Sequence, residues 1–176
     1  GGMNKKMYDG KFYTTKSVWG HSHLVEIAPN GEMLPVIAKD GSINAFDIAN
    51  GKVLMTAMRD RKLIEIYSYD LAAGEEKQLT TFNQEYHDTH EIVDPEYFTF
   101  MDRDGVELDG WVLKPVGYEP GKKYPAILEM HGGPKAIFGS VFHHEMQMWA
   151  NAGYFVIFCN PRGSDGRGGD FGFIQG

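Results

Sequence analysis

The chain has 176 residues, enough for one or two small domains, and 42% hydrophobic residues, an ordinary value for a globular protein. Its formal net charge of -7 and the lack of a basic cluster argue against a nucleic-acid partner. The longest apolar run, Tyr154 to Cys159, is far shorter than the roughly 20 residues of a membrane-spanning helix, so no membrane partner is expected. The single cysteine excludes an internal disulfide and fits a reducing compartment, which predicts a cytoplasmic location.

The first half of the chain has the pattern of antiparallel β structure. Turn signals at Pro29-Asn30-Gly31, Asp40-Gly41, Asn50-Gly51 and Ala73-Gly74 separate short apolar stretches. These stretches predict strands over residues 11–15, 24–28, 33–37, 43–48, 53–58, 63–69 and 77–80. The last four strands span about 40 residues, the period of one β-propeller blade, and the first three belong to a preceding blade. Two blades do not close a ring, because propellers need roughly four to eight.

Histidines in this half raise the question of a metal site. His87 and His90, with Asp88 and Glu91, would offer ligands on a helix. They lack the His-Glu-x-x-His spacing and a nearby third ligand, so a polar linker is the favoured interpretation, with no metal or cofactor. His21 and His23 project to the same face of a strand, which we interpret as a hydrated propeller edge.

A β-hairpin is expected next. Alternating runs lie on both sides of the Asp104-Gly105 turn, with Tyr97 in the first run and Trp111 in the second. We predict that Tyr97 and Trp111 share one antiparallel hairpin that packs on a strand over residues 126–130, with Trp111 largely buried.

The last part of the chain predicts a βαβ unit. Two apolar strands, over residues 126–130 and 154–159, flank a segment with Phe142, Met146 and Trp149 at helical spacing. Strand, glycine turn, helix and strand in this order are the building block of doubly wound sheets.

The first of these strands ends abruptly at His131-Gly132-Gly133-Pro134. The glycines permit positive φ, and the proline has no backbone donor. Backbone N–H groups without obstructing side chains can approach a ligand closely, which an oxyanion hole requires. A glycine turn after a strand is also often only a turn, and on this motif alone the two alternatives are about equal.

Taken together, the motifs resemble the prolyl oligopeptidase family of serine peptidases, from about Lys11 to Gly176. The resemblance is carried by Tyr124 to Pro134, by Asn160-Pro161-Arg162-Gly163-Ser164 and by the hairpin segment. The His-Gly-Gly-Pro form is most similar to the acylaminoacyl-peptidase and dipeptidyl-peptidase branches. The resemblance implies a mixed fold. An antiparallel β-propeller remnant of about two blades (residues 1–82) is followed by a linker (83–95) and by the N-terminal part of an α/β-hydrolase domain (96–176).

The resemblance also implies roles for individual residues. Gly133 would donate its N–H to an oxyanion, with Gly132 as second candidate, and His131 would brace the glycine turn. Arg162 would brace the neighbouring loops, or it is only a surface arginine beside a Pro-Gly turn. No catalytic residue is assigned, because the chain contains no Gly-x-Ser-x-Gly elbow and neither Ser140 nor Ser164 fits one.

The implied whole protein is a serine peptidase that cleaves short peptides through an acyl-enzyme. We expect the chain to be a fragment that is inactive alone, with Gly1-Gly2-Met3 as a cloning scar or designed start. Its expected partners are the peptide substrate of the parent enzyme and either a second copy, through exposed sheet edges, or the remainder of that enzyme. The alternative is a non-enzymatic, propeller-derived module that binds a partner, but a pure propeller would not contain a βαβ unit.

Overall fold

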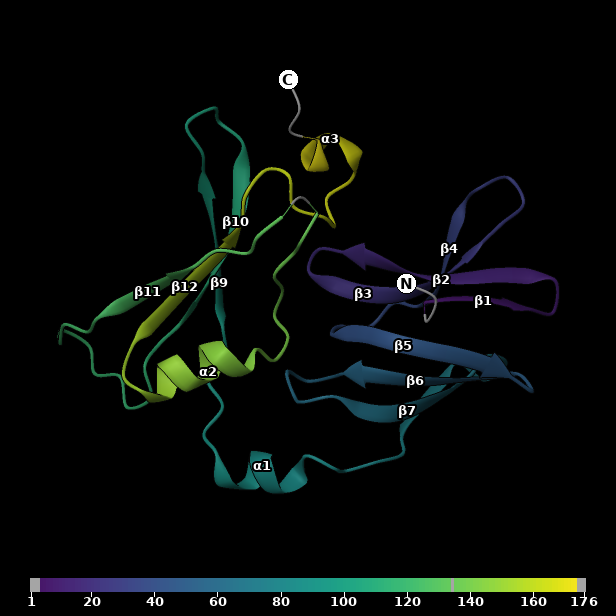
Figure 1. Cartoon of the computed structure of the whole chain (residues 1–176), viewed down its shortest axis with the longest axis horizontal. Helices are drawn as coiled ribbons and strands as arrows, with labels where there is room; N and C mark the ends of the chain where they lie inside the picture. Colours follow the sequence, from purple (N-terminus) through teal and green to yellow (C-terminus); the bar gives the residue numbers. More distant parts are fainter. Residues whose placement is uncertain (1–3, 134, 174–176) are drawn as a thin grey trace. The chain divides into compact units, whose positions relative to one another are not determined.

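The computed structural model describes residues 4–133 and 135–173, which are mostly β structure (Figure 1). The chain divides into two compact units, residues 1–88 and residues 89–176, called here the N-terminal and C-terminal units. Each unit is built around its own sheet and its own hydrophobic core.

The N-terminal unit consists of two groups of four antiparallel strands. The first group contains β1 (Lys5–Tyr8), β2 (Lys11–Val18), β3 (His21–Ile27) and β4 (Met33–Ile37). The second contains β5 (Ser42–Ala49), β6 (Lys52–Met58), β7 (Glu65–Asp70) and β8 (Glu75–Gln78). The two groups are joined by one parallel pairing, Ser22 with Ser42, and the described strands form an open sheet. The prediction of about two propeller blades is therefore confirmed.

The first blade differs from the prediction in two places. Strand β1 was not predicted, and β2 extends to Val18 before a tight turn at Trp19-Gly20. Both turn residues have positive φ, 50° and 81°, as a two-residue hairpin turn requires. Tryptophan is not a turn signal, so the sequence pattern gave no indication of this turn.

The interpretation of His21 and His23 as a propeller edge is wrong. The two rings do share a face and stack, with centroids 6.1 Å apart, but β3 pairs with β2, β4 and β5. Burial, together with the neighbouring His21, lowers the pKa of His23.

A buried ion pair lies within the second blade. Arg59 Nε and Nη2 donate to the two carboxylate oxygens of Glu76 at 3.1 and 3.0 Å, and the side chains are only 8% and 7% exposed. The guanidinium also lies over the ring of Tyr67, 5.9 Å from its centroid. Because both charges are removed from water, each depends on the other for its stability in the fold.

The predicted polar linker begins with a short helix, α1 (Gln84–Thr89). Glu65 anchors the chain before it, since its carboxylate accepts hydrogen bonds from Phe82 N at 3.0 Å and Asn83 N at 2.7 Å. His87 Nε2 accepts the N–H of Leu63 at 3.1 Å, so this nitrogen is engaged in a hydrogen bond within the unit. Within the described residues, no group of three or more potential ligands could hold a metal ion.

The C-terminal unit contains a four-stranded sheet in the order β11-β12-β10-β9. Its elements are β9 (Glu96–Met101), β10 (Glu107–Leu113), β11 (Ala126–Glu129), α2 (His144–Asn151), β12 (Phe155–Asn160) and α3 (Gly169–Gly172). Strands β11 and β12 are parallel neighbours connected through α2, which confirms the βαβ unit (Figure 1).

The hairpin is confirmed, but its predicted position is wrong. Tyr97 pairs with Trp111 across β9 and β10, and Gly105 N donates to Asp102 O at 3.1 Å in the turn. Trp111 is 4% exposed, as predicted. However, β10 pairs with β12 instead of β11, and the Trp111 and Phe158 rings stack at 5.5 Å. Chain order does not decide which strand becomes the neighbour, because only about two-thirds of sequential strands are adjacent.

The core of this unit forms between the sheet and α2. Its buried members are Trp111, Leu113, Phe138, Met146, Ala150, Val156 and Phe158. Phe138 comes from the loop between β11 and α2, so this loop is fixed to the core at one point.

Candidate functional site

The glycine turn lies at the carboxyl end of β11. Because β11 and β12 are adjacent and parallel, the loop after β12 begins at the same end of the sheet. In open α/β sheets, this end is where ligands bind. The structure therefore brings two motifs together, His131-Gly132-Gly133 and Asn160 to Ser164.

Backbone hydrogen bonds connect the two motifs just after the turn. Lys135 N donates to Gly163 O at 2.8 Å, and Asp165 N donates to Ala136 O at 3.1 Å. These bonds lie on either side of Ser164 in the chain. The end of the glycine turn is thus held against the loop that follows β12.

The side chain of Asn160 adds a second attachment. Its Oδ1 accepts the N–H of Phe138 at 2.8 Å, and its Nδ2 donates to the carbonyl of Phe138 at 3.0 Å. Asn160 is only 3% exposed, so these bonds are shielded from water. The last residue of β12 therefore binds both the N–H and the carbonyl of Phe138 and fixes the β11–α2 loop at this residue.

His131 and Ser164 form a close pair on the other side of the turn. His131 Nε2 lies 2.9 Å from Ser164 Oγ, and the His131 ring packs edge-on against Phe138 with centroids 5.1 Å apart. Ser164 is fully buried. Its hydroxyl also contacts Pro161 O at 2.7 Å.

This pair looks like a serine–histidine catalytic dyad, but its hydrogen bonds have the opposite direction. A carbonyl oxygen can only accept, so the single hydroxyl proton of Ser164 is donated to Pro161 O. Ser164 Oγ then accepts from His131 Nε2, whereas a general base would have to accept the serine proton. Burial also keeps Ser164 away from a substrate.

The backbone of the turn itself is open to a ligand. Gly133 has φ +70°, and a Cβ placed on Gly132 or Gly133 would meet no atom within 4 Å. Within residues 4–133 and 135–173, no acceptor takes the N–H of Gly132 or of Gly133. Exposed, unpaired N–H groups at a strand end are suited to bind a negatively charged oxygen.

Arg162 contacts the hairpin rather than the glycine turn. Its Nε lies 3.1 Å from Asp102 Oδ2, and its Nη2 donates to Asp104. Both acids belong to the β9–β10 turn, and the arginine side chain is 45% exposed. Arg162 therefore ties the loop after β12 to the hairpin.

A second arginine in this loop was missed by the sequence reasoning. Arg167 donates to Glu107 O at 2.6 Å and stacks on Phe171, 4.3 Å from the ring centroid. It also lies 3.7 Å from the buried Asp109, which accepts the hydroxyl of Tyr97 at 2.7 Å. That hydrogen bond raises the pKa of Tyr97 to about 12. The contacts with Glu107 and Asp109 could not be expected from the sequence around Arg167, because they join segments about 60 residues apart in the chain.

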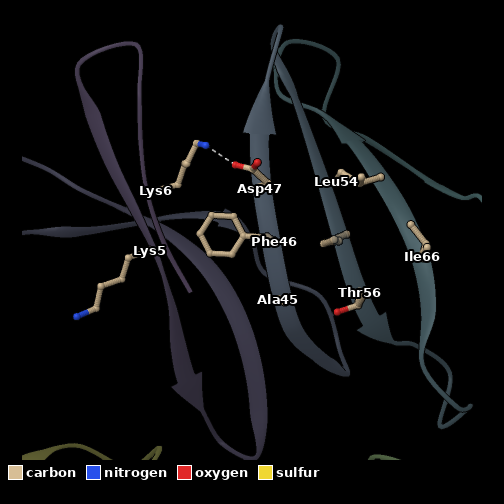
Figure 2. Close-up of a pocket in the computed structure, with 9 residues that line it drawn as sticks. Lys5, Lys6, Ala45, Phe46, Asp47, Leu54, Thr56 and Ile66 are labelled. Carbon is tan, nitrogen blue, oxygen red and sulfur yellow. Dashed lines mark ion pairs between the residues drawn. The ribbon is translucent and has the colours of Figure 1, made fainter. Parts of the chain in front are cut away.

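The N-terminal unit carries a groove of about 410 Å³, lined by residues of β1 and of the second blade (Figure 2). Figure 2 shows Lys6 directed toward Asp47, with which it forms an ion pair, while Lys5 points away. The remaining wall includes the exposed Leu54 and the partly buried Ile66. The residues that line the groove include no serine, cysteine or histidine.

Among the helices that the structure describes, none is long and apolar enough to cross a membrane.

Sequence comparison finds similarity to peptidases, although no family model matches the chain. The chain is 34% identical over 162 residues to an uncharacterized peptidase, YuxL, of Bacillus subtilis, covering 91% of this chain and 24% of the relative. It is 28% identical over 151 residues to dipeptidyl-peptidase 5 of Arthroderma otae, covering 80% of this chain and 20% of that protein. The chain thus spans about a fifth to a quarter of the length of these curated relatives.

Structure comparison agrees with these relatives. The acylaminoacyl peptidase of Pyrococcus horikoshii matches 96% of this chain with a TM-score of 0.83 and 34% identity, over 26% of its own chain. A puromycin-hydrolyzing peptidase of Mycobacterium tuberculosis matches 97% of this chain with a TM-score of 0.68. At 17% identity, that second likeness shows the fold alone.

Proposed function

From its correspondence in sequence and fold to part of a prolyl oligopeptidase-family serine peptidase, we propose that this chain supplies the oxyanion-binding loop of a peptidase. The observation that carries the proposal is the glycine turn, whose Gly132 and Gly133 N–H groups have no acceptor among the described residues and lie at the carboxyl end of a parallel strand. The similarity to an acylaminoacyl peptidase spans this turn and supports the same interpretation.

The reaction of the whole protein would be acyl transfer to a serine, followed by hydrolysis of the acyl-enzyme by water. Attack on the peptide carbonyl creates an oxyanion, and Gly133 N–H is the first candidate to stabilise it, with Gly132 N–H as the second. In α/β-hydrolases, another donor comes from the residue after the nucleophilic serine. The chain has no Gly-x-Ser-x-Gly elbow, so the nucleophile, acid and base are not assigned to its residues.

The substrate would be a short peptide, and the protein would act in the cytoplasm. The names of the relatives leave two substrate classes open, acylaminoacyl peptides and peptides with a free N-terminal dipeptide. The non-enzymatic alternative, a β module that binds a partner, is disfavoured by the β11–α2–β12 unit and its open turn.

Substitution of Gly133 with alanine tests the proposed function in the peptidase that contains this segment. Alanine at φ +70° is strained, so the turn is expected to rotate and withdraw its N–H, lowering kcat about 10²- to 10³-fold with little change in KM. Hydrolysis of acylaminoacyl and dipeptidyl p-nitroanilides would measure this. The matched control is Gly121→Ala, which imposes the same strain at φ +85° in open space outside the turn. Equal effects of the two substitutions on kcat would contradict the proposal.

We also propose that exposed strand edges lead to association with a second copy. Among the strands that the structure describes, β9 lies at the edge of its sheet beside β10, and its exposed residues include Phe98, Phe100 and Met101. Unpaired N–H and C=O groups on an apolar edge favour pairing with another chain. Sedimentation at micromolar concentration should give a species heavier than one 19.8 kDa chain, and a single species at that mass would contradict this.

A further inference from the structure

We propose that the buried Ser164 hydroxyl is a positioning residue, which holds the His131 ring in its Nε2–H tautomer and thereby holds the glycine turn in its open conformation. The inference rests on the proposed function for what the turn binds. It assigns a role to the serine that most resembles a nucleophile in the sequence and that the proposed chemistry does not use.

The two contacts of Ser164 Oγ determine where the protons of this pair lie. Ser164 Oγ has one proton, and the 2.7 Å contact with Pro161 O requires that proton between the two oxygens. The 2.9 Å contact with His131 Nε2 is then a hydrogen bond only if Nε2 carries a proton. The geometry of Ser164 therefore selects the tautomer of His131.

The other ring nitrogen agrees with this assignment. His131 Nδ1 is buried and has no hydrogen-bond partner among the described residues. A proton on Nδ1 would be a buried donor without an acceptor among the described residues, and buried N–H groups are rarely left unpaired. The neutral ring with Nε2–H and bare Nδ1 satisfies both observations.

The glycine turn is attached to the loop after β12 at both of its ends. His131 is held before Gly132 by Ser164 and by the edge of Phe138. After the turn, Lys135 N donates to Gly163 O, the carbonyl next to Ser164. Residues 163–165 thus hold both ends of a segment in whose middle the N–H groups of Gly132 and Gly133 have no acceptor among the described residues.

Nitrogen-15 NMR of the histidine side chains in the unmodified chain tests the tautomer assigned to His131. We expect His131 Nε2 to resonate as a protonated nitrogen and Nδ1 as a bare one at neutral pH. A bare Nε2 with a protonated Nδ1 would overturn the proposal, and this result does not depend on any variant folding.

Ser164→Ala tests whether the Ser164 hydroxyl holds the glycine turn in place. The variant should release the ring, shift the Gly132 and Gly133 amide resonances and accelerate hydrogen exchange of the Lys135 amide about tenfold. The matched control is Ser140→Ala, which removes a hydroxyl that accepts the indole N–H of Trp111 at 3.0 Å in the same unit. The control should leave the glycine resonances and the Lys135 exchange unchanged, and equal effects of the two variants would overturn the proposal.

Substitutions of His131 provide the rescue. His131→Gln keeps an N–H donor near the Nε2 position and should retain slow Lys135 exchange, whereas His131→Phe keeps a ring without a donor and should behave like Ser164→Ala. If Gln and Phe have the same effect, the donated hydrogen bond is not what holds the turn. The tautomer and exchange measurements do not use peptidase activity. They can therefore fail while the Gly133→Ala test of the proposed function succeeds, and the reverse.

Discussion

Replacing Phe158 with alanine is expected to destabilise the C-terminal unit by about 3–5 kcal/mol. Phe158 is 1% exposed and lies at the centre of the aromatic core. Its ring stacks on Trp111 at 5.5 Å and meets the edge of Phe138 at 5.3 Å. Alanine would leave a cavity between the sheet and the β11–α2 loop, which the rigid β12 backbone could only partly close.

Urea denaturation, followed by tryptophan fluorescence, would measure the loss. The control is Leu128→Ala in the neighbouring strand β11, where the side chain is 58% exposed and the expected change is within about 0.5 kcal/mol. Because Phe138 packs on Phe158, the Phe158→Ala variant should also loosen the segment that follows the glycine turn. A loss below about 1 kcal/mol would mean that this core is not packed as described.

Arg59→Met is expected to destabilise the N-terminal unit by about 3–5 kcal/mol at neutral pH, because it leaves the Glu76 carboxylate buried without its main partner. Lys39, 3.4 Å from Glu76 and half-exposed, would compensate only in part. Burial alone would raise the pKa of Glu76, but hydrogen bonds from Arg59 and its charge outweigh burial and lower it.

The lowered pKa gives this prediction a pH dependence. A carboxylate whose pKa is lowered in the folded state stabilises the fold at any pH above its pKa in the unfolded chain, which is 4.5 for Glu76. That contribution disappears as the pH falls through the folded-state pKa. The stability difference between the native chain and Arg59→Met should therefore shrink below about pH 4.5.

Chemical denaturation at neutral and acidic pH would measure the difference. Lys6→Met is a control, because it breaks the more exposed ion pair with Asp47, and water screens that pair so its loss should change stability far less. A second variant, Arg59→Met with Glu76→Leu, removes both charges and should recover much of the loss. No recovery in the double variant would show that the charges are not the cause.

Local patterns predicted most of the strands. The second blade, β5 to β8, follows from alternation between clear turns such as Asn50-Gly51, where Asn50 has φ 51° and Gly51 has φ 73°. The hairpin and the βαβ unit were equally readable, because their periods and turns are local. The Trp19-Gly20 turn was not, since its backbone is set by the pairing of β2 with β3 rather than by residue preference.

The missed features depend on contacts between distant parts of the chain. The position of β10 beside β12 involves contacts such as the stacking of Trp111 on Phe158, which lie far apart in the chain. The glycine turn was found from its sequence, but its attachment to Ser164 and Asn160 was not, because those partners follow it across a helix and a strand. Sequence reasoning thus located the site, whereas the hydrogen bonds that hold it required the fold.

Labelling of the purified chain with a fluorophosphonate, read by intact-mass and peptide mass spectrometry, tests the central claim most directly. In our account this chain contributes an oxyanion-binding turn and no nucleophile, and Ser164 donates its proton to a carbonyl instead of to His131. We therefore expect no labelling beyond that of the heat-denatured chain. Stoichiometric labelling at Ser164 would contradict the account, because it would require His131 to accept the serine proton and the pair to act as a catalytic dyad.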